Sequence, residues 1–334
     1  MKKLINNPEG VLEDMLAGLT AAYPEYLKKL DNANVIVRAN SKKDKVSVIS
    51  GGGSGHEPAH AGYVGYGMLD GAVCGEVFTS PTPDQVYEAI KATDNGQGVL
   101  VVIKNYTGDV MNFEMAKGMA EDEGIKVEEV IVNDDVAVEN SLYTAGRRGI
   151  AGTVFVHKIA GAKAESGSNL EEVKRVAEKT IENVRSMGMS LSSCIVPAAG
   201  KANFCLGEDE IEIGMGIHGE PGTHREKIST ADEITEHLVN KILDDMTIKN
   251  GDDVAVLVNG LGSTPNMELY IVNKKINKML KDKGINIHKT FIGEFMTALE
   301  MAGCSISILK LDDELKELLD QNLILQDSKY FRLI

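Results

Sequence analysis

Short apolar runs alternate with amphipathic stretches through the first half of the chain. The runs at residues 46–50, 71–77, 98–104 and 126–132 are rich in β-branched residues and have the length of buried strands. Residues 84–92 have helical spacing. Thr82, Pro83 and Gln85 form a capping-box pattern at the start of that predicted helix. Strands that alternate with helices predict a largely parallel sheet with helices packed against it.

The second half of the chain mixes strand and helix patterns in a similar way. A helix that is charged on one face is predicted over residues 169–187, where it connects two domains. Strands are predicted at 211–217, 254–258 and 305–309, and helices at 231–246 and 267–283. We therefore predict an α/β fold of two α/β domains, residues 1–187 and 188–334, each with a mostly parallel or mixed sheet flanked by helices.

One internal repetition links the two halves. Residues 254–265 follow the same order as residues 46–58: a strand, a Gly-x-Gly-Ser segment, a proline and a helix. Two related α/β units explain this order, and so does the small number of strand-to-helix turns that proteins use. The sequence leaves both explanations open.

Composition and charge exclude several classes of function. The 334 residues carry a formal net charge of −15, which disfavours nucleic acid as a partner because phosphate backbones attract basic surfaces. The longest aliphatic run, residues 99–103, is too short to span a bilayer, and the N-terminus lacks the apolar segment of a signal peptide. The four cysteines form no C-x-x-C pair and indicate reduced thiols. We expect a cytoplasmic protein.

Residues 51–60, GGGSGHEPAH, contain the H-E-x-x-H pattern of zinc proteases. A zinc site would need His56 and His60 on one face of a continuous helix. Pro58 fits the first position of a helix, so we expect the helix to begin there and His56 to precede it. The sequence signals no third ligand nearby, and we predict no metal site.

The same glycine-rich segment resembles a phosphate cradle only in part. It lacks the Gly-Lys-Ser/Thr ending of a P-loop and the G-x-G-x-x-G spacing of a dinucleotide-binding turn. Glycines still allow a ligand to approach the backbone, and N–H groups at a helix start bind oxygen atoms. The segment favours a small, oxygen-rich ligand with His56 at its edge, and the alternative is a tight turn with a solvated histidine.

Two further segments carry candidate chemistry. The strand at 98–104 ends at Lys104 with Asp109 close behind, and ligands of open α/β sheets bind at the carboxyl ends of strands. Asp109 could equally be a helix N-cap, and Lys104 an ordinary strand-end lysine. In GMGIHGEPG (214–222), Gly216 and Gly219 remove bulk beside His218, which suits a nucleophile or a ligand, although a glycine-rich loop also tolerates an incidental histidine. The other histidines outside residues 51–60 lie in less distinctive surroundings, and we expect them to be structural or exposed.

Six segments together resemble the dihydroxyacetone kinases. They are GGGSGHEPAHAGYVG (51–65), EVFTSPTPDQV (76–86), KNYTGDVMNFEMA (104–116), GIAGTVFVHKIAGA (149–162), GMGIHGEPG (214–222) and VNGLGSTPNMELY (258–270). They occur in family order through nearly the whole chain. Larger, ATP-dependent members carry a second, nucleotide-binding domain, for which this chain has no room. We therefore expect the separate dihydroxyacetone-binding subunit of the bacterial kinase that depends on phosphoenolpyruvate through the phosphotransferase system (PTS).

The resemblance implies roles for particular residues. It implies that His218 binds dihydroxyacetone covalently as a hemiaminal and that His56 and Asp109 are the acid/base pair. The implied substrate contacts are Gly53, Ser54, Gly55, His56, Lys104, Asp109 and His218. His60 is expected to serve packing.

The resemblance also implies partners. This chain would hold no cofactor, and ADP or ATP with Mg²⁺ would sit on a partner subunit that is recharged by the PTS phosphoryl donor subunit. A homodimer is implied, with each site between the two domains of one chain. Two other functions stay open: a regulatory relative that binds dihydroxyacetone and acts through a transcription factor, and a sugar-binding protein with no catalytic part.

Overall fold

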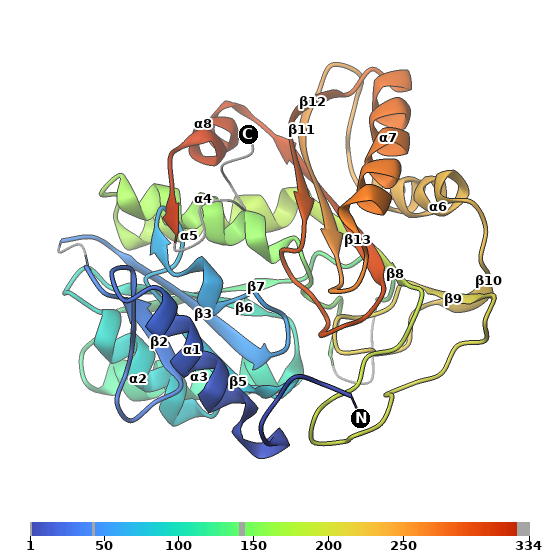
Figure 1. The fold of residues 1–334 in the computed structure, drawn as a ribbon. Coiled ribbons are helices and arrows are strands. Elements are labelled where there is room, and N and C mark those ends of the chain that lie inside the picture. The colour runs from blue at the N-terminus through green and yellow to red at the C-terminus, as the bar shows by residue number, and fades with distance from the viewer. Residues whose placement is uncertain (1, 42–43, 140–143, 326–334) are drawn as a thin grey trace.

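The computed structural model describes residues 2–41, 44–139 and 144–325 and is built around two six-stranded sheets (Figure 1). The strands of the first sheet lie within residues 27–132, and those of the second within 184–311. Helices pack against both sheets. The predicted α/β class, with two sheets flanked by helices, is confirmed.

The first sheet has the order β1-β2-β5-β3-β6-β7. Its strands are β1 (Leu27–Lys29), β2 (Val35–Arg38), β3 (Ser47–Ser54), β5 (Gly71–Val77), β6 (Val99–Lys104) and β7 (Val127–Val132). The four strands β5, β3, β6 and β7 are parallel, while β2 and β1 add to one edge in antiparallel pairs. The helices beside this sheet include α1 (Val11–Ala22), α2 (Pro83–Thr93) and α3 (Thr107–Asp122). The carboxyl ends of β3 and β6 therefore lie next to each other.

The second sheet is mixed and has the order β10-β9-β8-β13-β11-β12. Its strands are β8 (Val184–Ser190), β9 (Glu210–Ile213), β10 (His224–Lys227), β11 (Asp253–Gly260), β12 (Asn286–Gly293) and β13 (Gly303–Leu311). β11 and β12 are parallel, and the other pairs are antiparallel. The helices beside this sheet include α6 (Ala231–Asp244), α7 (Asn266–Asp282) and α8 (Asp313–Asp320).

Helix α4 (Thr153–Glu165) joins the two sheets in one core. Nearly every residue of α4 is buried, and α5 (Leu170–Asn183) packs beside it. One cluster of buried side chains contains Val102 of β6, Ile159 of α4 and Leu257 of β11. The short pair β4 (Gly65–Tyr66) and β14 (Ile324–Leu325) adds a second link between distant parts of the chain. This shared core fixes the loops of the two sheets relative to each other.

Several predicted boundaries are wrong. The helix predicted over 169–187 ends at Asn183, and β8 begins at Val184, because a central strand buried along almost its whole length has no alternation to mark its start. The strand predicted over 211–217 ends at Ile213, where Gly214 turns the chain with φ of +76°. The predicted domain boundary after residue 187 falls within β8 and stays a prediction.

The helix start predicted in the glycine-rich segment is also wrong. No helix begins at Pro58; residues 57–60 form a turn, followed by a 3-10 turn at Ala61–Tyr63. Carbonyl groups of this turn are bonded by a distant segment, since the Thr297 hydroxyl donates to Glu57 O and Leu299 N–H donates to Gly55 O. At α2 the predicted start is confirmed, with Thr82 as N-cap and Pro83 at the first helical position. The predicted capping box is absent, since the Thr82 side chain makes no capping bond and the Gln85 side chain accepts the Asn34 N–H.

The helices of the described part of the chain differ from membrane-spanning helices in length and composition. None of those within residues 2–41, 44–139 and 144–325 combines the length and the apolar character that crossing would require. The longest, α7, has 17 residues, and its partly charged sequence packs against the second sheet.

Candidate active site

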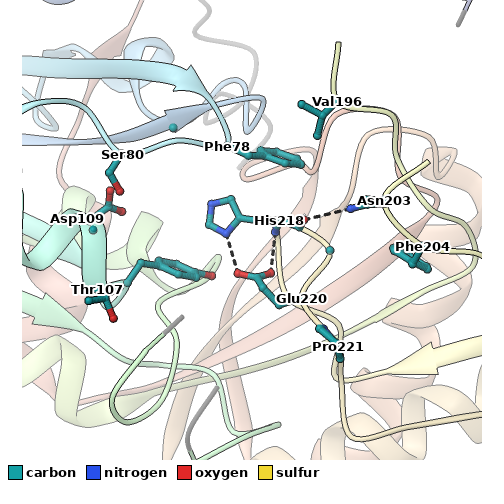
Figure 2. A pocket seen from close by; sticks show the side chains of 14 residues that line it. Phe78, Ser80, Thr107, Asp109, Val196, Asn203, Phe204, His218, Glu220 and Pro221 are labelled. Carbon is teal, nitrogen blue, oxygen red and sulfur yellow. Dashed lines mark hydrogen bonds and ion pairs between the residues drawn. The ribbon is translucent and has the colours of Figure 1, made fainter. Parts of the chain in front are cut away.

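A pocket of about 720 Å³ lies between the carboxyl-end side of the first sheet and the segment 196–221. It is lined by Gly53, Phe78, Ser80, Tyr106, Thr107, Gly108, Asp109, Val196, Asn203, Phe204, His218, Gly219, Glu220 and Pro221 (Figure 2). The first seven come from the ends of β3, β5 and β6 and the start of α3. This is the position at which open α/β sheets bind ligands.

Asp109 presents a buried carboxylate to the pocket. It is the third residue of α3, whose N-cap is Tyr106, so the N-cap interpretation of Asp109 is wrong. Its Oδ2 lies 3.8 Å from the Lys104 Nζ. Its Oδ1 is buried and has no hydrogen-bond partner among the described residues. One oxygen of a carboxylate that is only 3% exposed is thus available to a ligand.

Lys104 lies behind Asp109 and is completely buried. Burial lowers the pKa of its ammonium, and the negative charges of Asp109 and Glu220 act in the opposite direction. The side chain passes over Gly52, where an added Cβ would lie 2.5 Å from the Lys104 Nζ. The glycines at 51–53 are therefore part of strand β3, where their missing side chains make room for neighbours, and do not form a loop after the strand.

His56 is fully buried beside His218, with 4.7 Å between their ring centroids. Its Nδ1 lies 2.7 Å from the Thr297 carbonyl oxygen, so Nδ1 carries the proton and donates it. Its Nε2 has no partner in the part of the chain that the structure describes. Burial lowers the pKa of His56 well below its ordinary 6.5, and His218 and Lys104 lower it further. His56 is thus a neutral imidazole with a free lone pair.

His218 extends from the 214–222 loop toward Asp109 and Ser80 (Figure 2). Its Nδ1 lies 2.8 Å from Glu220 Oε1, and its backbone N–H donates to Glu220 Oε2 at 2.9 Å. Because a carboxylate only accepts, Nδ1 carries the proton, and the lone pair of the neutral ring is on Nε2. The side chain of His218 is 18% exposed, so the ring is held in place but accessible.

Glu220 is a functional residue that sequence reasoning missed. Burial alone would raise the pKa of its carboxyl, but His218 and Arg148 outweigh burial and lower the pKa to about 2. Arg148 also fixes the loop, since its Nη2 donates to Gly214 O at 2.7 Å while its Nε donates to Asp135 at 2.8 Å. The Glu-Pro-Gly sequence after His218 gives no signal of this pairing.

The glycines around His218 serve the loop differently from the prediction. A Cβ at Gly216 would lie 2.1 Å from Glu220 Oε2, and one at Gly219 would lie 1.9 Å from Asn203 Nδ2. Asn203 in turn donates to His218 O at 3.1 Å. The space that these glycines leave is filled by the side chains that hold His218.

Two aromatic rings that the sequence did not single out frame the imidazole. The Tyr106 ring centroid lies 4.6 Å from that of His218, and the Phe78 centroid lies 5.3 Å from it. Phe78 also stacks on His56 at 5.1 Å. Phe78 has φ of +56°, a conformation that costs energy for a bulky residue and recurs at functional sites. The only sequence feature that could have pointed to Phe78 and Tyr106 is their position just after the predicted strands β5 and β6.

The remaining predicted contacts lie behind the pocket wall. The Ser54 hydroxyl donates to Gly75 O at 2.7 Å, and Gly55 N–H donates to the Glu57 carboxylate at 3.0 Å. His60, expected to serve packing, is buried but also contacts Lys104, with 3.1 Å between His60 Nε2 and Lys104 Nζ. The structure thus brings Gly53, Asp109 and His218 to the pocket surface, with the other predicted residues in the layer beneath.

Within the described ranges, no group of three or more His, Cys, Asp or Glu side chains is placed to hold a metal ion. The pocket instead combines the His218 imidazole and the open Asp109 carboxylate, with the neutral His56 imidazole buried beside His218. Such groups suit nucleophilic attack and proton transfer.

Comparison with known proteins places this site in a family. Residues 17–325 match the Dak1 domain. The chain is 54% identical over 314 residues to the PTS-dependent dihydroxyacetone kinase 1, dihydroxyacetone-binding subunit DhaK, of Listeria innocua, covering 94% of this chain and 95% of the relative. It is 43% identical over 344 residues to the PEP-dependent dihydroxyacetone kinase, dihydroxyacetone-binding subunit DhaK, of Escherichia coli strain K12, covering 96% and 97%.

Solved structures agree with the sequence relatives. The native dihydroxyacetone kinase of C. freundii has a TM-score of 0.89 and 36% identity, covering 98% of this chain and 60% of that chain. The dihydroxyacetone kinase operon co-activator Dha-DhaQ also has a TM-score of 0.89, with 35% identity and coverage of 95% and 98%. On the family match and these identities, the chain belongs to the Dak1 family of dihydroxyacetone kinase domains.

Proposed function

We propose that this chain is the dihydroxyacetone-binding subunit of a PTS-dependent dihydroxyacetone kinase. The observation that supports it most directly is that two residues with an open polar atom, His218 with Nε2 and Asp109 with Oδ1, line one pocket. His56, whose Nε2 also has no partner among the described residues, is buried beside His218. The names of the relatives at 54% and 52% identity supply the substrate and the phosphoryl source. The groups at the pocket suit the two steps of this activity, covalent binding of the substrate and phosphoryl transfer.

In the binding step, His218 Nε2 attacks the carbonyl carbon of dihydroxyacetone. An N–C bond forms, the carbonyl π electrons move to oxygen, and that oxygen takes up a proton from solvent to become the hydroxyl of a hemiaminal. The positive charge that attack places on the ring lies against the Glu220 carboxylate. Glycerol has no carbonyl and cannot form this bond, so the covalent step selects ketones over polyols.

In the transfer step, Asp109 would take the proton of a terminal hydroxyl, with His56 assisting. That oxygen would bond to the γ-phosphorus of ATP on the partner subunit, while the bond from this phosphorus to the β–γ bridging oxygen breaks and ADP leaves. Gly53 and Lys104 hold the hydroxyl groups, and Ser54 and Gly55 support this wall through β3. Phosphoryl transfer depends mainly on positioning and charge stabilisation. The nucleotide and Mg²⁺ that complete the site would be carried by a partner subunit, which the PTS phosphoryl donor recharges from phosphoenolpyruvate.

Assembly and location belong to the same proposal. The chain would act as a homodimer in the cytoplasm, with each pocket formed within one chain. The subunit names of the relatives support the existence of partner subunits. Size-exclusion chromatography with light scattering measures the oligomeric state directly.

A regulatory role is the second candidate, because the co-activator Dha-DhaQ shares this fold at 35% identity. The higher identities to kinase subunits favour catalysis, and the open Asp109 carboxylate gives the pocket a base that ligand sensing alone does not need. A regulatory relative would bind dihydroxyacetone and bind a transcription factor without supporting turnover.

A reconstituted phosphotransfer assay distinguishes these functions. The purified chain with ATP and Mg²⁺ alone should not phosphorylate dihydroxyacetone. Addition of the ADP-loaded partner subunit and the phosphotransfer chain should give turnover. Robust activity of the isolated chain with ATP would overturn the proposal that a partner subunit carries the nucleotide. Adduct formation without any reconstituted turnover would favour the regulatory role.

A further inference from the structure

Lys104 contacts a second histidine, His60, which has no role in the two proposed steps. Lys104 is fully buried at the end of β6, and its Nζ lies 3.1 Å from His60 Nε2 and 3.8 Å from Asp109 Oδ2. A lysine ammonium only donates hydrogen bonds, so His60 Nε2 must be the acceptor in this contact. That requires a His60 ring with its proton on Nδ1.

The neighbours of His60 impose that tautomer. His60 Nδ1 lies 3.4 Å from the Ser50 Oγ, and the Ser50 hydroxyl donates its single proton to Val102 O at 2.7 Å. Because that proton is already used, Ser50 Oγ can only accept from His60 Nδ1–H. The hydrogen bonds therefore run in one direction from the Lys104 ammonium through His60 and Ser50 to the backbone of β6.

Burial keeps His60 neutral, as this direction requires. Burial lowers its pKa well below the ordinary 6.5, and Lys104, His157 and His56 lower it further. The charged and titratable groups around the pair come from several segments: Asp109 on α3, His157 on α4, His56 on the turn after β3 and Glu220 on the 214–222 loop. The lone pair of His60 thus stays available to Lys104 at neutral pH.

Gly52 explains how these side chains come together. A Cβ at this position would lie 2.5 Å from Lys104 Nζ, 3.5 Å from Asp109 Oδ2 and 3.7 Å from His60 Nε2. The backbone of Gly52, with φ of +151°, is thus at the centre of the polar cluster. Space for the contact between His60 and Lys104 depends on this glycine.

We propose that His60 is a positioning residue that holds Lys104 for the substrate. It occupies one N–H of the ammonium, which directs the others toward Asp109 and a substrate hydroxyl. Ser50 fixes the His60 tautomer and supports the same role from one bond further away. This role deepens the proposed function and rests on it for the identity of the substrate.

Two substitutions at position 60 separate hydrogen bonding from packing. His60→Leu keeps an apolar side chain of similar size without an acceptor, while His60→Gln offers an amide oxygen to Lys104. A hydrogen bond to a charged group is worth about 1.5–3 kcal/mol, so His60→Leu should raise the KM for dihydroxyacetone by about 10- to 100-fold in the reconstituted assay. His60→Gln should restore most of the loss, and kcat should change less than KM in both.

A matched control removes a neighbouring buried imidazole outside the chain of bonds. His157 lies 5.2 Å from His60 between ring centroids, and its ring nitrogens have no hydrogen-bond partner among the described residues. His157→Leu should leave KM unchanged. Thermal unfolding of all three variants reports whether each retains the fold.

A second measurement needs no substrate. In the ligand-free protein with ¹⁵N-labelled histidine, long-range ¹H–¹⁵N spectra should show His60 with Nδ1 protonated and Nε2 unprotonated, a signal assigned by its loss in His60→Gln. An Nε2-protonated ring, or equal KM values for His60→Leu and wild type, would overturn the role. If His60→Gln fails as badly as a folded His60→Leu, packing is the explanation. A wild type without adduct or turnover would refute the proposed function, and the spectrum would still decide the direction of the hydrogen bonds.

Discussion

On the first-sheet side of the pocket, His56 and Lys104 are fully buried and Asp109 is 3% exposed, whereas His218 on the opposite side keeps 18% of its side chain exposed. Burial dominates the first side: it lowers the pKa values of His56 and Lys104. A charge pair dominates the second, where Glu220 stays ionised beside His218 with a pKa of about 2. The proposed base, Asp109, therefore lies among groups whose pKa values burial lowers, and the proposed nucleophile, His218, lies beside a carboxylate that stays ionised.

The difference has a structural cause. The buried groups sit on β3, β6 and α3 or in the turn after β3, which regular elements and the Thr297 segment hold rigidly. His218 sits in a loop, and its orientation depends on hydrogen bonds that Glu220 accepts from His218 and that Asn203 and Arg148 donate to backbone oxygens of the loop. Substitutions on the first side should therefore change proton transfer, and substitutions on the second should change adduct formation.

Replacement of His218 by alanine should have the largest effect, because it removes the only atom proposed to bond the substrate. Intact-mass measurement of wild type under gentle conditions should show a gain of one intact dihydroxyacetone, and His218→Ala should show none. An imidazole adduct cannot lose water to an imine, so borohydride should fail to trap it. Lys104→Ala should still form the adduct. A dehydrated, borohydride-trapped adduct on Lys104 would refute the assignment of the nucleophile.

Asp109→Asn tests the buried side by itself. The change removes the base with little change in volume, so turnover in the reconstituted assay should fall by about a hundred- to ten-thousand-fold. The mass of the adduct should be unchanged, since His218 is not altered. Turnover near the wild-type value would assign Asp109 a structural role and break the division between the two sides.

How far the sequence could predict these two sides also differs. Lys104 and Asp109 follow a strongly apolar strand, so their place at a carboxyl end was predictable from local pattern, as was the parallel sheet. His56 was correctly placed outside a helix, but the helix predicted to begin at Pro58 and to contain His60 does not form. This turn is held by Thr297, which lies 241 residues from His56. Three glycines inside β3 were assigned to a loop, because the residues that need the space, such as Lys104, are distant in sequence.

On the second side, the family resemblance singled out His218 and local pattern did not predict its support. Glu220 lies two residues from His218, yet its pairing depends on the fold of the loop around Gly216 and on Arg148, 66 residues from Gly214. Tertiary packing determines such contacts. The spacing of residue types along the sequence does not reveal them.

A third test sharpens the comparison through pH. His157 is buried beside His60, and burial with the Lys104 charge lowers its pKa to about 3. The unfolded chain binds a proton near pH 6.5 and the folded chain does not, so stability is lost as pH falls below 6.5. His157→Leu should remove this dependence. When the pH is lowered from 7 to 5, the unfolding free energy of the variant should fall by about 2 kcal/mol less than that of wild type. Urea unfolding at the two pH values measures it, and an unchanged loss would contradict the neutral, buried state.

Glu220→Gln tests the second side, whose acid sensitivity should have the same sign as that of His157 but fall in a lower pH range. The Glu220 pKa is about 2 in the folded protein against an ordinary 4.5, so its ionised form stabilises the fold above pH 4.5, and this contribution is lost as pH falls toward 2. Between pH 7 and 5 the contribution is constant, so wild type and variant should lose stability in parallel there. Between pH 5 and 3 wild type should lose about 2 kcal/mol more than the variant. The two sides would then differ in pH range. Above pH 5 the loss of unfolding free energy on acidification would come from the buried imidazoles, and below pH 5 from the Glu220 carboxylate that supports His218. If Glu220→Gln instead changed the slope between pH 7 and 5, the charge pair would titrate with the buried histidines, and the two sides would form one coupled unit.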